Sequence, residues 1–518
     1  MTSEHDMTHV VADAYRFEGP ALELGTLMLD AATVTPAQVR IPLGMLNRHG
    51  LVAGATGTGK TKTLQLLAEQ LSAQGVPVFA ADIKGDLSGL AQPGAPGDKI
   101  DARSRAVGHG WAARGFPMEL FAIGGEGIGV PLRATISSFG PTLLAKVLDL
   151  NDTQESSLGL VFHYADKAGL PLLDLADLRA VVQFLLSDDG KADLKGLGGL
   201  SPATAGVILR ELIGFSDQGA DAFFGEPELD TADFLRVTGD GQGVISLVEL
   251  PQLQNRPAVF STFLMWLLAD LFNDLPEVGD IDKPKLVFFF DEAHLLFRDA
   301  SKAFREAIAQ TVRLIRSKGV GVFFVTQSPT DVPDDVLAQL GSRVQHQLRA
   351  HTPNDAKALK ATVNTYPTSG YDDLGEVITS LGIGEAVVTV MNERGAPTPV
   401  AWTMLRAPES SMSPADQTVL DGIVSGSPLQ QKYGEVVDRE SAHERLAARL
   451  EAGAEQARAE APADKPAQRT SYPRKSSPLP QEQGSVVHDI LTSPMAKDLA
   501  RTAAREIFRG VFGTARRR

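Results

Sequence analysis

The amino-acid sequence predicts an α/β protein built around a mainly parallel β-sheet. Short apolar runs at residues 50–53, 76–81 and 286–290 are typical of strands buried on both faces. The first run is followed by a helical stretch at residues 60–74, in which leucines recur at three- and four-residue spacing. Strands that alternate with helices in this way predict a parallel sheet covered by helices on both faces.

The remaining elements continue this alternation. Further strands are expected at residues 118–123, 243–250, 319–326 and 344–350, and further helices at residues 257–273 and about 300–317. Two runs at residues 385–392 and 398–403 indicate a hairpin, and residues 89–115, rich in Gly, Pro, Asp and Arg, indicate a loop.

Composition shifts along the chain predict its domain organisation. A core of two parts is expected to be interrupted by an all-helical insertion and followed by a linker and a tail. The expected segments are a short N-terminal segment (1–45), the first part of the core (46–140), the insertion (141–236), the second part of the core (237–405), a helical or disordered linker (406–485) and a basic amphipathic C-terminal helix (486–518).

Composition and charge exclude several classes of protein. The 518 residues include 49 Lys and Arg against 64 Asp and Glu, so the net charge is −15, which argues against a surface uniformly coated with DNA but permits a local basic channel. No cysteine is present, which excludes disulfides, thiolate metal sites and cysteine nucleophiles. The most apolar stretch, residues 259–272, is shorter than the ~20 residues of a membrane span, so we expect a cytoplasmic protein without an integral membrane segment.

A glycine-rich loop carries the strongest chemical signal. Residues 54–61 match the pattern G-x-x-x-x-G-K-[ST] in full, between an apolar strand and a helix. Glycines let backbone N–H groups approach phosphate oxygens, and the start of the helix adds its positive dipole end. Lys60 would supply a charge to the β- and γ-phosphates, and the Thr61 hydroxyl would bind Mg²⁺. The expected contacts to ATP are Gly54, Ala55, Thr56, Gly57, Thr58, Gly59, Lys60, Thr61 and Lys62.

A pair of carboxylates ends the apolar strand at residues 285–290. This is the Walker B arrangement, in which Asp291 would hold Mg²⁺ and Glu292 would take a proton from the attacking water. An Asp that merely caps the next turn would explain the pair by itself, but the phosphate loop upstream favours the catalytic interpretation. His294 in the same turn indicates a structural or sensing residue rather than a metal ligand.

Other candidates lie at predicted strand ends. Gln327 follows the strand at 319–326, where its amide could orient water beside the γ-phosphate. Arg313 and Arg316 precede that strand, and one of them could act as an arginine finger on a neighbouring subunit. Asp82, Lys84 and Asp86 follow the strand at 76–81. They could contact nucleotide, Mg²⁺ or a partner subunit, or they could form an ordinary polar turn, and the sequence favours neither alternative.

These motifs in this order resemble the HerA/FtsK superfamily of RecA-like motor ATPases, most closely its bacterial YjgR-type, helicase-like branch. The resemblance spans about residues 20–405 and rests on residues 54–61, 82–86, 290–294, 316–321 and 325–328. It implies a RecA-like P-loop NTPase core with a mainly parallel sheet, an all-α insertion and a C-terminal helical tail. It also implies Lys60 and Thr61 on nucleotide and Mg²⁺, Asp291 on the metal, Glu292 as base, Gln327 as sensor and Arg316 as the arginine acting in trans.

The same resemblance implies partners. Family members form hexameric rings that thread double-stranded DNA, and archaeal members act with a NurA-type nuclease. Segment 1–45 is shorter than the N-terminal β-barrel that HerA proper uses to dock that nuclease, and the helical insertion is prominent. ATP hydrolysis is therefore the firmest implication, and DNA translocation and the nuclease are less firmly implied.

The end of the chain has a pattern of its own. Apolar residues recur every four positions from Met495 to Val511, and residues 496–518 hold seven basic and two acidic side chains. Docking on another subunit explains this pattern most simply, followed by contact with nucleic acid and then by contact with a membrane surface.

Together these observations predict an ATP-hydrolysing motor that forms a ring and acts on DNA. Two alternatives remain: an ATPase of the same fold that acts on protein partners, and a nucleotide-gated scaffold without useful turnover. Glu292 argues against the scaffold, because such a base is needed only for hydrolysis. A nucleotide kinase is disfavoured by the Asp–Glu pair and by the lack of an evident arginine-rich lid.

Overall fold

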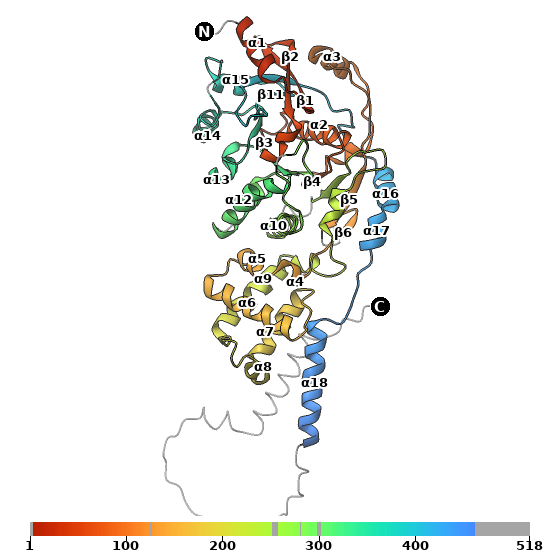
Figure 1. The fold of residues 1–518 in the computed structure, drawn as a ribbon, viewed down its shortest axis with the longest axis vertical. Helices are drawn as coiled ribbons and strands as arrows, with labels where there is room; N and C mark the ends of the chain where they lie inside the picture. Colours follow the sequence, from red (N-terminus) through yellow and green to blue (C-terminus); the bar gives the residue numbers. More distant parts are fainter. Residues whose placement is uncertain are drawn as a thin grey trace, which may run out of the picture. The chain divides into compact units, whose positions relative to one another are not determined.

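The computed structural model describes residues 4–123, 127–250, 257–279, 281–297, 302–367 and 369–460. The residues up to Ala454 form one compact unit. Within the described residues a 12-stranded sheet has the order β2-β1-β12-β11-β10-β3-β9-β8-β4-β7-β5-β6 (Figure 1). The strands are β1 (Ala21–Leu29), β2 (Ala32–Pro42), β3 (Gly50–Ala53), β4 (Val78–Asp82), β5 (Met118–Ile123), β6 (Val130–Leu132), β7 (Ile245–Glu249), β8 (Leu286–Phe290), β9 (Val320–Thr326), β10 (Ser342–Gln345), β11 (Glu385–Thr389) and β12 (Ala401–Leu405).

Helices separate most of these strands. They are α1 (Glu4–Ala14), α2 (Lys60–Ala73), α3 (Asp98–Val107), α4 (Ile136–Phe139), α5 (Pro141–Val147), α6 (Asp152–Lys167), α7 (Leu175–Leu186), α8 (Asp188–Asp193), α9 (Pro202–Asp217), α10 (Pro257–Asp274), α11 (His294–Phe297), α12 (Lys302–Ile315), α13 (Asp334–Leu337), α14 (Pro353–Val363), α15 (Leu374–Ser380), α16 (Gln417–Gly426), α17 (Pro428–Tyr433) and α18 (Ala442–Glu460). Helices α5 to α9 fall in the stretch where an insertion is expected, between β6 and β7. The domain boundaries themselves stay a prediction.

The strands from β10 to β6 in the sheet order are all parallel to one another. Their carboxyl ends therefore lie along one edge of the sheet, which is where open α/β sheets bind ligands. The predicted mainly parallel α/β fold is confirmed. Strands β11, β12, β1 and β2 extend this sheet in antiparallel pairing, and β11 and β12 form the predicted hairpin.

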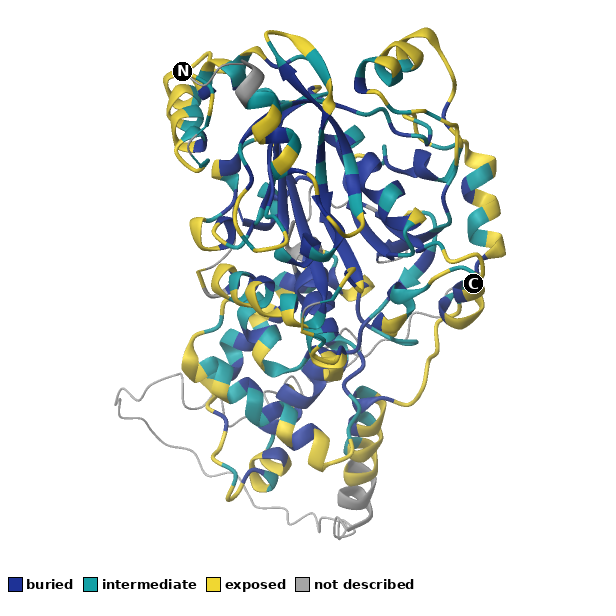
Figure 2. Cartoon of the chain, turned by 45° about the horizontal axis from the view of Figure 1, so that its top comes forward, coloured by how far each residue is buried: buried dark blue, intermediate teal, exposed yellow. Residues whose placement is uncertain are grey.

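Both faces of the parallel part are buried, as the apolar runs predict. In β8, Phe288 and Phe290 belong to one hydrophobic core, whereas Val287 and Phe289 belong to another. The first core contains buried side chains of α10, α12 and the helical insertion, and the second contains those of α2. The two cores thus lie on opposite faces of the sheet, and Figure 2 shows the strands buried between the covering elements.

The first 45 residues contribute more to the sheet than their weak sequence pattern indicates. They form the long hairpin of β1 and β2, in which the register shifts twice and the exposed Pro36 lies in the bulged part of the edge strand β2. The Tyr15 hydroxyl donates to the carbonyl oxygens of Val388 (3.0 Å) and Pro399 (2.8 Å). This pair of bonds ties the chain before β1 to the β11–β12 hairpin.

Two details of the sequence interpretation need correction. The expected loop at 89–115 contains α3, whose buried residues are limited to Val107, so the helix has no apolar periodicity to reveal it. The strand expected at 344–350 ends at Gln345, because its parallel partner β3 ends at Ala53 where the glycine-rich loop begins. The expected C-terminal helix at 486–518 lies outside the described residues. No helix in the described part of the chain is long and apolar enough to span a membrane.

Candidate nucleotide site

The glycine-rich loop connects β3 to α2 in a conformation that requires its glycines. Gly59 has φ = 116° and stands directly before α2, where an L side chain would be strained. At Gly54 an added Cβ would come within 2.5 Å of the Cβ of His346, so that position has no room for a side chain. The loop is also tied to its neighbours, because the Ala55 amide donates to the Gln347 carbonyl oxygen (2.8 Å).

Lys60, the first residue of α2, folds back onto this loop. Its Nζ donates to the carbonyl oxygens of Gly54 (2.7 Å) and Ala55 (3.1 Å), and the side chain is buried. Burial lowers the pKa of Lys60, and the charge of Lys84 lowers it further, against the opposing effect of Glu292 and Asp291. The loop lysine and the two carboxylates are therefore close enough to influence one another electrostatically.

Strand order explains this convergence. Strand β9 lies between β3 and β8 and is parallel to both, so the chain leaves all three strands at the same edge. The amide of Asp291 donates to the Ala81 carbonyl oxygen at the end of β4 (3.3 Å), and the amide of Ala293 donates to the Val325 carbonyl oxygen of β9 (2.9 Å). These bonds fix the acidic pair at the carboxyl edge, next to the loop.

The two carboxylates have different surroundings. Burial raises the pKa of Asp291 to about 7, although the nearby Lys84 opposes the shift. For Glu292 burial also raises the pKa, but the hydrogen bond and charge of Lys84 outweigh it and leave the pKa below its usual value. Glu292 is therefore ionised near neutral pH, as a proton acceptor must be.

Glu292 is held in a strained and crowded position. Its backbone has φ = 48°, which lies in the left-handed region that non-glycine residues rarely adopt. The Nζ of Lys84 lies 2.5 Å from Oε1, and Nδ1 of His294 lies 3.2 Å from Oε2. Both carboxylate oxygens therefore have a basic side chain beside them.

The polar residues at the end of β4 and in the turn that follows it have different roles. The buried carboxylate of Asp82 accepts the backbone amides of Lys84 (3.0 Å), Gly85 (2.9 Å) and Leu87 (2.7 Å), so Asp82 has the turn-forming role. Lys84 instead reaches the catalytic candidate Glu292. Sequence reasoning missed this ion pair, because it depends on β4 being the neighbour of β8 in the sheet.

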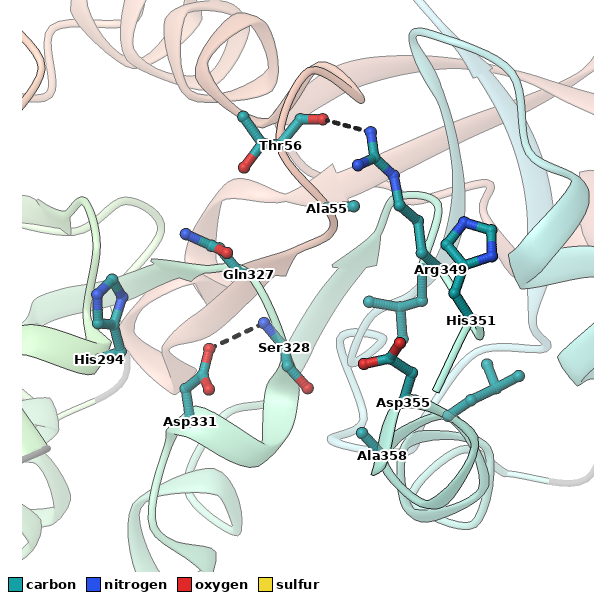
Figure 3. A pocket seen from close by; sticks show the side chains of 12 residues that line it. Ala55, Thr56, His294, Gln327, Ser328, Asp331, Arg349, His351, Asp355 and Ala358 are labelled. Atoms are coloured by element: carbon teal, nitrogen blue, oxygen red, sulfur yellow. Dashed lines mark hydrogen bonds between the residues drawn. The ribbon is translucent and has the colours of Figure 1, made fainter. Parts of the chain in front are cut away.

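Gln327 lines a cavity of about 410 Å³ in front of the loop. Figure 3 shows its amide between Thr56 of the loop and His294 of the acidic turn. Arg349 closes the opposite side and donates from Nη2 to the Thr56 carbonyl oxygen (3.4 Å). The predicted sensor therefore lies in the same cavity as the loop, and Arg349 is a lining residue that no sequence pattern indicates.

His346 supports the loop from behind. It is fully buried, and its Nε2 lies 2.8 Å from the Thr63 hydroxyl of α2. Burial, assisted by the charge of Lys60, lowers the pKa of His346 to about 4, so this imidazole is neutral at physiological pH. Its contact with Gly54 could not be read from the sequence, since the two residues are far apart along the chain.

The other predicted residues lie on different sides of the loop. Thr61 is half-buried in the first turn of α2, and the Lys62 ammonium donates to the Met412 carbonyl oxygen (2.6 Å) of the segment after β12. Arg313 and Arg316 lie before β9, at the amino edge of the sheet. The seven residues of β9, at ~3.3 Å each, separate Arg316 from the carboxyl edge by about 20 Å. The structure therefore does not bring Arg316 to the site of its own chain.

Comparisons with known proteins agree with this geometry. A family model described as Helicase HerA-like C-terminal matches residues 28–518. The DNA double-strand break repair helicase HerA of Saccharolobus solfataricus is 19% identical over 361 residues, covering 68% of this chain and 63% of that relative. The chain thus aligns with less than two thirds of that relative's length.

Solved structures share the fold. The bacterial conjugative coupling protein TrwBdeltaN70, in its unbound monoclinic form, superposes with a TM-score of 0.52 at 16% identity, covering 78% of this chain and 94% of that one. The plasmid coupling protein TrwB in complex with ADP and Mg²⁺ gives a TM-score of 0.50 at 17% identity, covering 78% and 99%. With the glycine-rich loop and the carboxylate pair on one edge of such a sheet, and with a family match over most of its length, the chain belongs to the HerA-like C-terminal helicase family of P-loop ATPases.

Proposed function

We propose that this protein is a Mg²⁺-dependent ATPase that assembles as a ring, most simply of six subunits, and translocates along or remodels double-stranded DNA. The observation that carries the proposal is a shared edge of the sheet: the loop with Lys60 follows β3 and the pair Asp291 and Glu292 follows β8, with β9 parallel between these strands. A loop that only bound nucleotide would not need a buried, ionised carboxylate beside it.

The chain's own groups suffice for each role in hydrolysis. The loop amides and Lys60 would bind the phosphates, with the Lys60 ammonium leaving the carbonyl oxygens of its own loop. Glu292 would accept a proton from water as the water oxygen bonds to the γ-phosphorus and the bond to the β–γ bridging oxygen breaks, releasing ADP and phosphate. Gln327 would orient that water from the cavity in front of the loop.

The donor set fits magnesium. Thr61 offers a hydroxyl oxygen and Asp291 a carboxylate oxygen, and hard oxygen donors are those that Mg²⁺ prefers. Burial raises the pKa of Asp291, and a divalent charge beside its carboxylate would favour the ionised form. When bound, Mg²⁺ would neutralise charge on the β- and γ-phosphate oxygens.

The position of Arg316 supports an assembly. Arg316 lies at the amino edge, about 20 Å from the edge of its own sheet where nucleotide would bind. It could therefore contact a nucleotide only if that nucleotide were bound by a second subunit packed against the amino edge. Ring-shaped packing of the amino edge of one subunit against the carboxyl edge of the next provides that arrangement.

The proposal of DNA as the substrate draws on the relatives. One is named as a DNA double-strand break repair helicase and others as conjugative coupling proteins. Since the net charge of this chain is −15, duplex DNA would have to bind in a channel lined locally by basic residues.

The decisive experiment measures ATP hydrolysis by the full chain with Mg²⁺, with and without duplex DNA, over a range of salt concentrations. We expect DNA to stimulate turnover, with a stimulation that falls steeply as salt rises. Glu292→Gln should keep nucleotide binding and lose hydrolysis by about 10²-fold or more. If duplex DNA leaves the rate of hydrolysis unchanged but a protein partner raises it, the alternative that acts on protein is supported. If the wild type and Glu292→Gln hydrolyse ATP at equal, negligible rates, the ATPase function is refuted.

A further inference from the structure

Lys84 occupies a position that the reaction scheme leaves unexplained. Strands β4 and β8 are adjacent and parallel, with Ala81 paired to Phe290, so the segment after β4 lies beside the residues after β8. Across this contact the Lys84 ammonium lies 2.5 Å from Oε1 of Glu292. The residue proposed as the general base is therefore paired with a cation of its own chain.

The segment that carries Lys84 is rigidly built. Asp82, which is fully buried, accepts hydrogen bonds from the backbone N–H groups of Lys84, Gly85 and Leu87. Gly85 completes the turn with φ = 72°, a value that suits glycine. The backbone of Lys84 is thereby fixed, and the partner of its ammonium changes only through its side-chain torsions.

The engaged state of Glu292 conflicts with its proposed task. Lys84 contacts one carboxylate oxygen, and the His294 ring lies 3.2 Å from the other. A carboxylate oxygen that accepts a hydrogen bond from an ammonium is poorly available to a water molecule. While the contact with Lys84 lasts, Oε1 is therefore poorly available to water, and Oε2 is buried with no hydrogen-bond partner among the described residues.

The incoming triphosphate provides the competing anion. The Lys60 ammonium lies on the loop after β3 and the Lys84 ammonium lies on Glu292 after β8, so both are at the carboxyl edge of the same parallel strands. The γ-phosphate carries more negative charge than one carboxylate and would be bound within that site. Lys84 then has two alternative anionic partners, one before and one after nucleotide binds.

We propose that Lys84 exchanges partners during the cycle: without nucleotide it holds Glu292, and with ATP it binds the γ-phosphate and releases Glu292 to accept a proton from water. This inference rests on the proposed ATPase function. It assigns Lys84 a role in distinguishing ATP from ADP, since ADP has no γ-phosphate to attract it. Premature proton abstraction is thereby suppressed until the triphosphate is in place.

The test is a binding cycle measured by calorimetry with Mg²⁺ and either ATPγS, which is hydrolysed slowly, or ADP. Lys84→Gln should weaken ATPγS binding by about tenfold and change ADP binding by less than about twofold. Glu292→Gln should tighten ATPγS binding, because Lys84 no longer has a competing partner. The double variant should lose that gain and bind ATPγS as Lys84→Gln does.

Controls separate charge from folding. Lys84→Arg keeps the positive charge and should retain at least part of the preference for ATPγS. Lys99→Gln removes one exposed positive charge from α3 and should leave both affinities unchanged. Circular dichroism and melting curves would verify that every variant folds.

The possible results distinguish failure of the proposed Lys84 exchange from failure of the proposed ATPase function. Equal weakening of ATPγS and ADP binding by Lys84→Gln, or a Glu292→Gln gain that persists in the double variant, would overturn the exchange. A wild-type chain that binds and hydrolyses ATP while Lys84→Gln has no effect would leave the ATPase standing and refute only the role of Lys84. A wild-type chain that binds neither nucleotide would refute the proposed function itself.

Discussion

The backbone amide of Gly54 donates a hydrogen bond of 3.1 Å to the carbonyl oxygen of Thr326. This bond joins the first residue of the glycine-rich loop to the last residue of β9, and Gln327 follows directly. The loop that would hold the phosphates and the residue that would sense them are therefore joined through the end of β9.

Gln327→Ala should lower the catalytic rate without weakening nucleotide binding. Gln327 lines the cavity in front of the loop, where its amide can orient water but is not needed to hold phosphate. We expect the turnover number to fall by about 10²-fold and the ADP affinity to change by less than about twofold. Steady-state hydrolysis and ADP calorimetry measure these quantities, with Gln431→Ala in α17 as a matched control. A proportional loss of ADP affinity would show that Gln327 acts in binding instead.

Arg316→Ala should abolish hydrolysis, and mixing these subunits with Glu292→Gln subunits should restore part of it. Because Arg316 lies at the amino edge of its own sheet, its proposed target is the nucleotide of another subunit. A mixture of Arg316→Ala with Glu292→Gln subunits creates interfaces where an intact Arg316 meets an intact Glu292. Hydrolysis in the mixture should therefore exceed the sum of the two separate activities.

The control for this mixing experiment is Arg313→Ala, one helical turn earlier on α12. Its hydrolysis should stay close to that of the wild type. Mixed subunits that show only the additive activity would indicate that Arg316 does not act across an interface.

Glu69 should make stability depend on pH. Burial raises its pKa to about 7, although the amides of Glu409 and Ser410 oppose the shift. Between pH ~4.5 and 7 the folded state therefore retains a proton that the unfolded state releases, so the free energy of unfolding falls as pH rises through this window. The contribution is about 3 kcal/mol across the window.

Urea denaturation at several pH values measures this effect. Glu69→Gln removes the titration, so the stability of this variant should fall less between pH 5 and 7.5 than that of the wild type. Asp82 and Asp291, whose pKa values burial also raises, remain in both proteins and cancel in the comparison. Glu211→Gln, an exposed change in α9, should leave the slope unaltered. A slope that is identical in wild type and Glu69→Gln would contradict the assignment.

Phe79→Ala should destabilise the fold strongly. The ring of Phe79 is fully buried in β4 and contacts Phe288 of the neighbouring strand, Phe263 of α10 and Phe234, with ring centroids 5.0 to 6.2 Å apart. Its removal leaves a cavity where the sheet meets its covering helices, at a cost of about 3–5 kcal/mol. Ile383→Ala, at a residue 76% exposed, should cost less than about 0.5 kcal/mol in the same denaturation measurement.

The parts of the site that follow from local sequence were predictable. The loop from Gly54 to Thr61 and the pair Asp291 and Glu292 each lie within one continuous motif that starts at the end of an apolar strand. Parallel strands align their carboxyl ends, so a shared edge could be expected without knowing the order of the strands.

The parts that depend on strand order were not predictable. Lys84 meets Glu292 because β4 is adjacent to β8, and His346 stands behind Gly54 because β10 is adjacent to β3. No residue pattern within either segment specifies its neighbour. Helix α3 was not predicted for a different reason, because it has almost no apolar face and so shows no apolar periodicity. It is held instead by Arg103, which donates to the carbonyl oxygens of Ile383 and Gly384.

The bulged outer strand β2 has a consequence for how copies of this chain can associate. Pro36 has no N–H to offer, and the residues around it depart from the regular ladder. An incoming strand would find no continuous row of donors and acceptors there, so this border resists sheet-to-sheet fusion and the aggregation that follows from it. Copies of the chain that associate across this border would therefore rely on side-chain contacts instead of a shared backbone ladder.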